Sequence, residues 1–235
     1  MKRTASVQSV DWDSARDILD TNGWALLRNL LSECECDTIS NLYGREDGFR
    51  SRVIMARHGF GRGEYRYFSY PLPPLIQELR TSLYPYLATI ANRWHARMEI
   101  EQRFPTTLKE FLDRCHENGQ LRPTPLLLQY AKGDYNCLHQ DLYGEHVFPL
   151  QVAVLLSDPN SDFEGGEFVL TEQRPRMQSR VSVVPLKKGD GVLFAVNNRP
   201  VTGTKGDYKV KMRHGVSPLR NGHRHTVGII FHDAA

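Results

Sequence analysis

The residues with the clearest chemical potential lie in the segment "NCLHQDLYGE", positions 136–145. His139 and Asp141 are two residues apart, and alternate side chains of an extended segment point the same way, so they can share one metal ion. Two histidines and one carboxylate on one face of a metal form a mononuclear iron(II) site with positions left open for co-substrate and oxygen. A His-x-Asp pair also arises by chance in a chain with nine histidines, so the site needs further parts.

A second histidine must come from a distant strand, and four candidates lie near the C-terminus: His214, His223, His225 and His232. If the co-substrate is 2-oxoglutarate, its far carboxylate needs a buried cation, best supplied by a guanidinium. The spacing favours His214, because Arg224 follows it by ten residues. We expect His214 to start one strand, Arg224 to start the next, and a hairpin turn at "RNG" to set them side by side. The other three histidines have no basic residue at a similar distance after them and are expected to be surface or packing residues.

The first half of the chain combines predicted helices with a few strands. Helical periodicity covers three segments, at 11–23, 73–98 and 107–120. Pro85 should kink or interrupt the second of these. Ser32 and Glu35 have capping-box spacing and predict the start of a further helix.

Strands are also expected in this half. "WALLRNLL" is a short apolar run that predicts one strand. The segment 48–70 alternates and is rich in aromatic residues, which predicts two strands around a turn at Gly59–Gly63.

After Pro125 short apolar runs follow one another with turn residues between them, a pattern typical of a β-sandwich or barrel. No repeat, low-complexity segment or linker interrupts the chain. We therefore expect one domain over 1–235 that is mainly β, with residues 1–124 as a helical brace with N-terminal strands and 125–235 as the β core.

Composition narrows the class of protein. No apolar run is long enough to span a bilayer, and the start, "MKRTASVQSVDWD", has no apolar core after its basic residues, which argues against a secretory signal. Four cysteines without zinc spacing predict free thiols in a cytoplasmic protein. The net charge is only +3, but residues 199–224 are strongly basic. This stretch is either a solvated surface loop or a surface that meets an acidic partner.

Four blocks of the second half resemble the 2-oxoglutarate/Fe(II) dioxygenases, most closely their prolyl-hydroxylase-like branch. The blocks are "LLLQYAKGDYNCLHQD", "FEGGEFVL", "KKGDGVLF" and "RHGVSPLRNGHRHTVGIIFH". The resemblance implies a double-stranded β-helix, or jelly-roll, core from about Leu126 onward, with Fe(II) and 2-oxoglutarate as cofactors and molecular oxygen as reactant. The chain also resembles a bacterial group of nucleic-acid oxygenases that is similar in supposed role to the AlkB repair dioxygenases.

Carried over by position, His139, Asp141 and His214 match the iron ligands of this superfamily. Arg224 matches the cation that binds the distal carboxylate of 2-oxoglutarate, and Tyr130 matches a tyrosine that hydrogen-bonds the same carboxylate. One departure concerns the AlkB enzymes, which carry a second arginine shortly after the first, whereas "HTVGIIFH" contains none.

The sequence leaves the substrate open between an alkylated base in single-stranded or damaged DNA or RNA and a peptide. A base must be taken out of its stack and held between aromatic faces. The segment 57–73 suits that, with Arg62 and Arg66 for phosphates and Tyr67 and Phe68 for stacking. The same aromatic hairpin could instead clamp an extended peptide, or simply pack as an edge hairpin. A small-molecule hydroxylase is a further possibility. A ligand-binding barrel without redox chemistry is disfavoured by the complete iron triad with Arg224.

Overall fold

The computed structural model describes residues 4–142 and 144–235. The helices are α1 (Thr4–Gln8), α2 (Trp12–Asn22), α3 (Glu33–Ser40), α4 (Pro74–Arg97) and α5 (Leu108–Glu117), with short 3₁₀ turns η1 (Asn41–Gly44) and η2 (Met55–Arg57). The strands of the first half are β1 (Trp24–Leu27), β2 (Phe49–Ile54), β3 (Gly61–Arg62) and β4 (Glu64–Phe68). Those of the second half are β5 (Leu126–Ala131), β6 (Tyr135–His139), β7 (Leu150–Leu155), β8 (Phe163–Gly165), β9 (Phe168–Gln173), β10 (Arg180–Val184), β11 (Gly191–Ala195), β12 (Asn198–Gly203), β13 (Gly206–Val216) and β14 (Leu219–Ile229).

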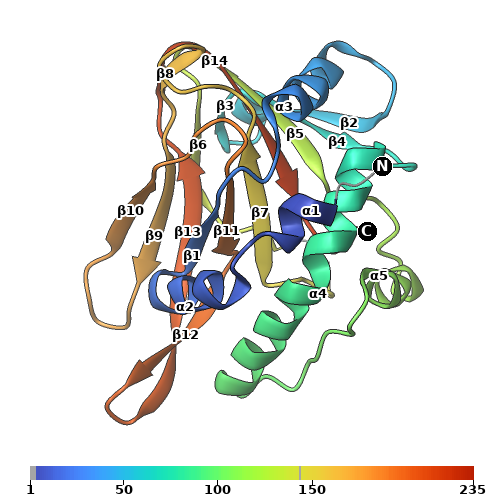
Figure 1. Ribbon diagram of the computed structural model, residues 1–235. Coiled ribbons are helices and arrows are strands. Elements are labelled where there is room, and N and C mark those ends of the chain that lie inside the picture. The colour runs from blue at the N-terminus through green and yellow to red at the C-terminus, as the bar shows by residue number, and fades with distance from the viewer. Residues whose placement is uncertain (1–3, 143) are drawn as a thin grey trace.

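The strands form two antiparallel sheets. The larger has the order β1-β11-β7-β14-β5-β4-β2, with β8 paired to β14. The smaller has the order β10-β9-β13-β6-β3, with β12 paired to β13. Several neighbours, such as β7 and β11 or β6 and β13, are distant in sequence, as in a jelly roll. The predicted mainly-β jelly-roll core with a helical brace is therefore confirmed (Figure 1).

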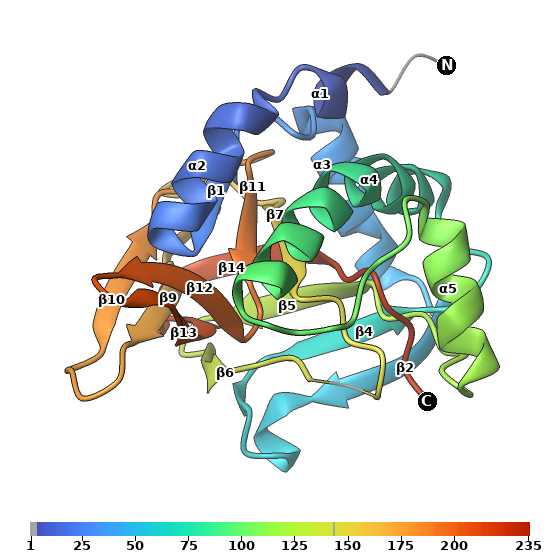
Figure 2. The same cartoon turned by 90° about the horizontal axis from the view of Figure 1, so that it is seen from below.

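The helices gather on one side of the β core, where α2 and α4 lie close to each other (Figure 2). Helix α4 is the main brace and buries one face from Leu75 to Trp94 against the larger sheet. The first half also supplies strands, because β1, β2 and β4 extend the larger sheet and β3 extends the smaller one. None of the helices in the described residues is both long and apolar enough to cross a membrane.

Local signals in the first half predicted its helices well. Asp11 caps α2 through Ser14 N–H, and Gly23 ends this helix in the left-handed region, at φ 78°. Ser32 and Glu35 form the expected capping box. The prediction that Pro85 interrupts α4 is wrong, because the helix is continuous. Pro85 lies on the exposed face, where water can satisfy the carbonyl that loses its helical partner.

Two predictions for the second half are also wrong. His214 lies near the end of β13 and Arg224 lies in the middle of β14, so neither begins its strand. The "RNG" segment is no hairpin turn, since Asn221 and Gly222 pair with β8 inside β14. The chain instead passes from one sheet to the other at Ser217–Pro218. As a result, His214 and Arg224 lie on different sheets.

The basic stretch 199–224 is neither a loop nor a uniform surface, because it forms β12, β13 and part of β14. Arg199 is only 1% exposed and forms a buried ion pair with Glu172 of β9. Its guanidinium also donates to the carbonyls of Asp20 (2.7 Å) and Thr21 (3.1 Å) in the last turn of α2, where a cation complements the helix dipole. Arg199 therefore joins the β core to α2.

We expect Glu172→Gln to destabilise the protein by about 3–5 kcal/mol, because it leaves the buried Arg199 without its counter-charge. Burial alone would raise the pKa of Glu172, but hydrogen bonds from Arg199 and Arg174 outweigh it, and the pKa lies below its ordinary value. A lowered pKa contributes stability that is present above the unfolded-state pKa and is lost as pH falls through the folded-state pKa. In urea unfolding, the difference from wild type should thus be full at pH 7 and shrink below about pH 4.

Asp113→Asn is the control for that measurement. It breaks the Lys109–Asp113 ion pair on α5 (2.7 Å), which is exposed, so the free energy of unfolding should stay nearly unchanged. Equal stability of Glu172→Gln and wild type at pH 7 would contradict the stabilising role given to the Glu172–Arg199 ion pair.

Candidate metal centre and co-substrate pocket

The three predicted metal ligands come together where the smaller sheet faces the larger one. His139 is the last residue of β6, and His214 on β13 is its direct cross-strand partner. Asp141 follows two residues after His139. One potential ligand atom from each of the three side chains lies within 4.8 Å of the other two, close enough for all three to bind one ion.

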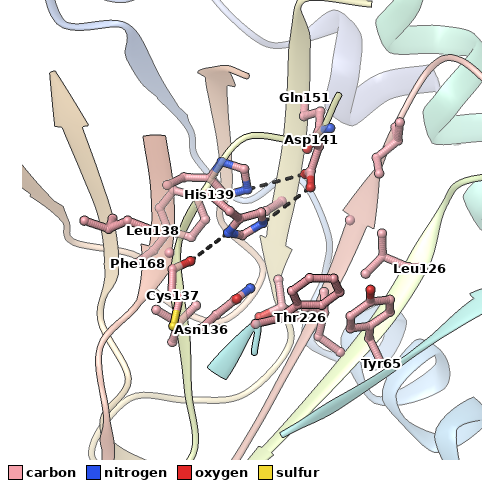
Figure 3. A pocket seen from close by; sticks show the side chains of 18 of the residues that line it. Tyr65, Leu126, Asn136, Cys137, Leu138, His139, Asp141, Gln151, Phe168 and Thr226 are labelled. Atoms are coloured by element: carbon pink, nitrogen blue, oxygen red, sulfur yellow. Dashed lines mark hydrogen bonds and ion pairs between the residues drawn. The ribbon is translucent and has the colours of Figure 1, made fainter. Parts of the chain in front are cut away.

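The three side chains face a common point. His139 Nε2 lies 3.4 Å from Asp141 Oδ1, and His214 Nε2 lies 3.5 Å from Asp141 Oδ2. His139 and Asp141 are seen pointing toward one another in Figure 3. The Nδ1 of His139 is 2.8 Å from the carbonyl oxygen of Cys137, to which it can donate. That bond fixes the ring and its tautomer and leaves the Nε2 lone pair for a metal.

The electrostatics of the three side chains suit a cation. Burial would raise the pKa of Asp141, but hydrogen bonds from His139 and His214 hold it well below its ordinary value. Burial and the nearby His139 lower the pKa of His214. Burial opposes ionisation of His139, but Asp141 raises its pKa overall. The carboxylate is thus ionised, and the His214 imidazole is neutral, as metal ligands must be.

A cavity of about 370 Å³ opens beside these side chains, between the two sheets. It is within the usual range of ligand pockets, roughly 300–1,000 Å³. Its walls come from β5, β7 and β14 of the larger sheet and from β6, β9 and β13 of the smaller one. Arg224 and Tyr130, which are direct cross-strand partners, also line it. The predicted ligands and the predicted anchor thus share one pocket.

Arg224 is a buried cation that forms no ion pair with the described residues, since the nearby Glu167 carboxylate pairs instead with Arg220 at 3.9 Å. It is 1% exposed, its Nη1 donates to the Thr226 hydroxyl at 2.6 Å, and its Nε has no hydrogen-bond partner. Within the described ranges no carboxylate forms an ion pair with it. Burial lowers the pKa of Arg224 to about 10. A buried guanidinium is costly unless an anion pairs with it, so this end of the pocket is built for one.

Tyr130 adds a hydroxyl at the same end. It is 1% exposed, and burial raises its pKa above the ordinary value. Asn136 lies near enough to influence that pKa, but the hydroxyl makes no well-formed hydrogen bond. A free hydroxyl beside an unpaired guanidinium fits a carboxylate such as the distal one of 2-oxoglutarate, and the His-Asp-His set fits iron(II).

The residues predicted to meet a substrate lie in different places. Tyr67 lines the pocket, together with Tyr65 two residues earlier on β4. Arg62 is exposed on β3, at the side of the pocket formed by Gly59 and Phe60.

The structure contradicts two of the predicted substrate contacts, those of Phe68 and Arg66. Phe68 is 1% exposed and stacks on Phe49 in the core, so it offers no free face to a base. Arg66 packs over the ring of Tyr43 at 4.8 Å and donates to the carbonyl of Arg45 at 2.7 Å. Successive side chains of β4 alternate between its faces, and the pocket face carries Tyr65 and Tyr67 instead.

Sequence reasoning missed Phe60 and Gln151, which also line the pocket. Phe60 is 46% exposed, and its position next to the predicted Gly59–Gly63 turn was a usable signal. Gln151 is the polar residue within "VFPLQVAVLLS", and a buried polar residue in an otherwise apolar strand was a signal as well.

Comparisons with known proteins agree with this site. Residues 63–234 match the model of a family described as an oxygenase catalysing oxidative methylation of damaged DNA. A curated protein of Mycobacterium tuberculosis (strain CDC 1551 / Oshkosh) is 49% identical over 168 residues, which is 72% of this chain and 72% of that protein.

Solved structures show the same fold. A 2OG-Fe(II) oxygenase family oxidoreductase from Burkholderia pseudomallei has a TM-score of 0.56 at 14% identity, over 97% of this chain and 93% of the other. A Trichoplax adhaerens prolyl hydroxylase, solved with a hypoxia inducible factor peptide, has a TM-score of 0.53 at 18% identity, over 94% and 89%. The chain therefore belongs to the family of oxygenases described as acting on damaged DNA, and it has the fold and the metal-ligand set of the 2-oxoglutarate/Fe(II) oxygenases.

Proposed function

We propose that this protein is a 2-oxoglutarate- and Fe(II)-dependent dioxygenase that oxidises an alkylated base in nucleic acid. The observation that carries the proposal is the composition of one pocket: a metal-ligand triad, an unpaired buried arginine and three tyrosines line the same cavity. The family description supports nucleic acid as the substrate.

The residues have separate roles in this proposal. His139, Asp141 and His214 hold iron(II), and Arg224 and Tyr130 bind the distal carboxylate of 2-oxoglutarate. With both bound, the site would use molecular oxygen as the oxidant, one oxygen atom entering a substrate C–H bond as a hydroxyl and the other entering succinate as 2-oxoglutarate loses carbon dioxide. The two sheets enclose the cavity and limit the access of water. On an N-methyl group, hydroxylation gives an unstable product that releases formaldehyde, so the base is demethylated.

The rim of the pocket supports a nucleic-acid substrate. Tyr65 and Tyr67 meet edge to face at 5.4 Å and present aromatic surface to the cavity. Phe60 is exposed beside them, and Arg57 and Arg62 are exposed on either side of Phe60 in the chain. Aromatic faces bind a base taken out of its stack, and flanking cations bind the phosphates.

The second candidate is a peptidyl hydroxylase. The Trichoplax adhaerens relative in fold was solved with a peptide fragment, and a pocket with exposed aromatic residues at its rim can also receive an extended peptide. The experiment that separates the candidates offers the iron-loaded protein methylated DNA and RNA oligonucleotides and proline-containing peptides, and measures succinate and formaldehyde. Succinate with formaldehyde on an oligonucleotide supports the proposal. Succinate on peptides alone overturns it.

We expect the double variant Arg57→Ala/Arg62→Ala to bind single-stranded DNA with a weaker dependence on salt. Each lost phosphate contact flattens the slope of log affinity against log salt by about 0.7, so the slope should fall by up to ~1.4. Fluorescence anisotropy with a labelled oligonucleotide, at a series of salt concentrations, gives the slope.

Lys205→Ala is the matched control for this slope. Lys205 is exposed at the turn between β12 and β13. The strand from there to His214 is roughly 26 Å long at 3.3 Å per residue. Because Lys205 lies this far from the metal ligands, loss of its side chain should leave the salt slope unchanged. A wild-type slope near zero would contradict a nucleic-acid substrate.

A further inference from the structure

Gln151 carries a buried amide nitrogen that makes no hydrogen bond in the part of the chain that the structure describes. It lies on β7, is 4% exposed, and lines the same cavity as the metal ligands. Its Nε2 has no hydrogen-bond partner among the described residues. Buried amide groups are almost always satisfied, so an unsatisfied one that faces a cavity indicates a partner that arrives with a ligand.

The neighbours of this amide on the adjacent strands are apolar. Its direct cross-strand partner on β11 is Phe194, which also lines the cavity. On the other side, β14 pairs Ile229 with Val152, which places Ile230 next to Gln151. A ligand bound here would therefore meet one polar amide between apolar side chains. Such an arrangement fixes the orientation of a flat ligand.

Gln151 lies far from the predicted anchor for the distal carboxylate of 2-oxoglutarate. Cross-strand register places Arg224 and Tyr130 in one row of the larger sheet, and Gln151 and Ile230 in a row six residues further along β14. Six residues of strand span roughly 20 Å. The distal carboxylate held at Arg224 is therefore out of reach of Gln151, and the group that meets this amide lies at the Asp141 end of the pocket. Figure 3 shows Gln151 and Asp141 at one end of the pocket and Thr226 and Tyr65 at the other.

We propose that Gln151 is a specificity-determining residue that hydrogen-bonds the edge of the substrate base. A side-chain amide offers a donor and an acceptor side by side, which matches paired acceptor and donor groups on a base edge. Tyr67 would supply the stacking face in the same cavity. The inference rests on the proposed function, because it takes the ligand that meets Gln151 to be a base.

Gln151→Met tests this role, because methionine has nearly the shape of glutamine but no hydrogen-bonding amide. We expect kcat/KM for the methylated oligonucleotide to fall tenfold or more. The affinities of the resting protein for Co(II), used as a spectroscopic probe of the iron site, and for 2-oxoglutarate should stay as in wild type. The melting temperature of the metal-free protein should be unchanged or higher, because an unsatisfied buried amide has been removed.

Gln129→Met is the matched control, since Gln129 lies on β5 of the same sheet and is not among the residues that line the pocket. It should leave kcat/KM unchanged. Unchanged kcat/KM in Gln151→Met would overturn the inference and leave the proposed function intact. A loss of Co(II) affinity in Gln151→Met would also overturn it and make Gln151 a positioning residue for Asp141. If the wild type oxidises no oligonucleotide, the proposed function fails first, and the inference fails with it.

Discussion

Asp141→Ala and His214→Ala are each expected to reduce 2-oxoglutarate turnover to background. The triad holds one carboxylate and two imidazoles around a single point, so each change removes one of three ligands. Asp141 is also the only anion of the set, and its loss leaves the positive charge of a bound cation uncompensated. Succinate formation, with and without added iron(II), measures the result, and circular dichroism checks that the fold is kept.

His223→Ala is the control for this pair. His223 is exposed on β14, one residue before the buried Arg224, and is not among the residues that line the cavity. Its loss should leave turnover as in wild type. Binding of Co(II) should be lost in Asp141→Ala and His214→Ala and retained in His223→Ala. The opposite pattern, with His223→Ala inactive and His214→Ala active, would show that the distal ligand is misassigned.

The metal ligands were predictable because their signal is local and chemical. His139 and Asp141 share a face through the period of two of an extended segment, which needs no knowledge of the rest of the fold. The predictions of the oxygenase class, of the cofactors and of the jelly-roll fold are confirmed by the family match, the triad and the solved relatives. The individual roles of Arg224 and Tyr130 remain predictions.

The path of the chain from His214 to Arg224 was not predictable in the same way. A hairpin within one sheet and a crossover between sheets both fit the ten-residue spacing. In the structure the chain crosses over, and β8, a strand of three residues, pairs with the start of β14 where a hairpin turn was predicted. Strands this short carry almost no sequence pattern. The two residues reach one pocket by facing each other across it, not by lying side by side.

The two faces of β4 show a second limit of prediction from the sequence. Tyr65 and Tyr67 alternate with Arg66 and Phe68, so both faces carry an aromatic residue and the alternation alone cannot tell which one faces the pocket. The answer comes from the opposite side, where Phe49 and Tyr43 provide a packing surface for Phe68 and Arg66. Phe49 belongs to the predicted hairpin itself, but Tyr43 lies in η1, outside the hairpin, so the alternation of the hairpin could not reveal this packing.

Arg224→Met is expected to raise the KM for 2-oxoglutarate by ~100-fold or more. The variant leaves the distal carboxylate in a buried pocket without a counter-charge, a loss of about 3–5 kcal/mol by analogy with broken buried ion pairs, and each ~1.4 kcal/mol is tenfold. Tyr130→Phe removes one hydrogen bond to a charged group, about 1.5–3 kcal/mol, and should raise KM by roughly tenfold or more. Arg220→Ala, at an exposed position of the same strand, should leave KM unchanged.

The thermal stability of Arg224→Met should change in a way that a general loss of structure would not produce. In the protein without ligand, Arg224 is a buried cation with an unsatisfied Nε, so an apolar residue of similar length should raise the melting temperature or leave it unchanged. Added 2-oxoglutarate stabilises the wild type by RT ln(1 + [L]/Kd), and a 100-fold weaker Kd removes about 2.7 kcal/mol of that effect at saturating ligand. The variant should therefore melt no lower than wild type alone and show little upward shift with 2-oxoglutarate. An unchanged shift would mean that another cation anchors the co-substrate.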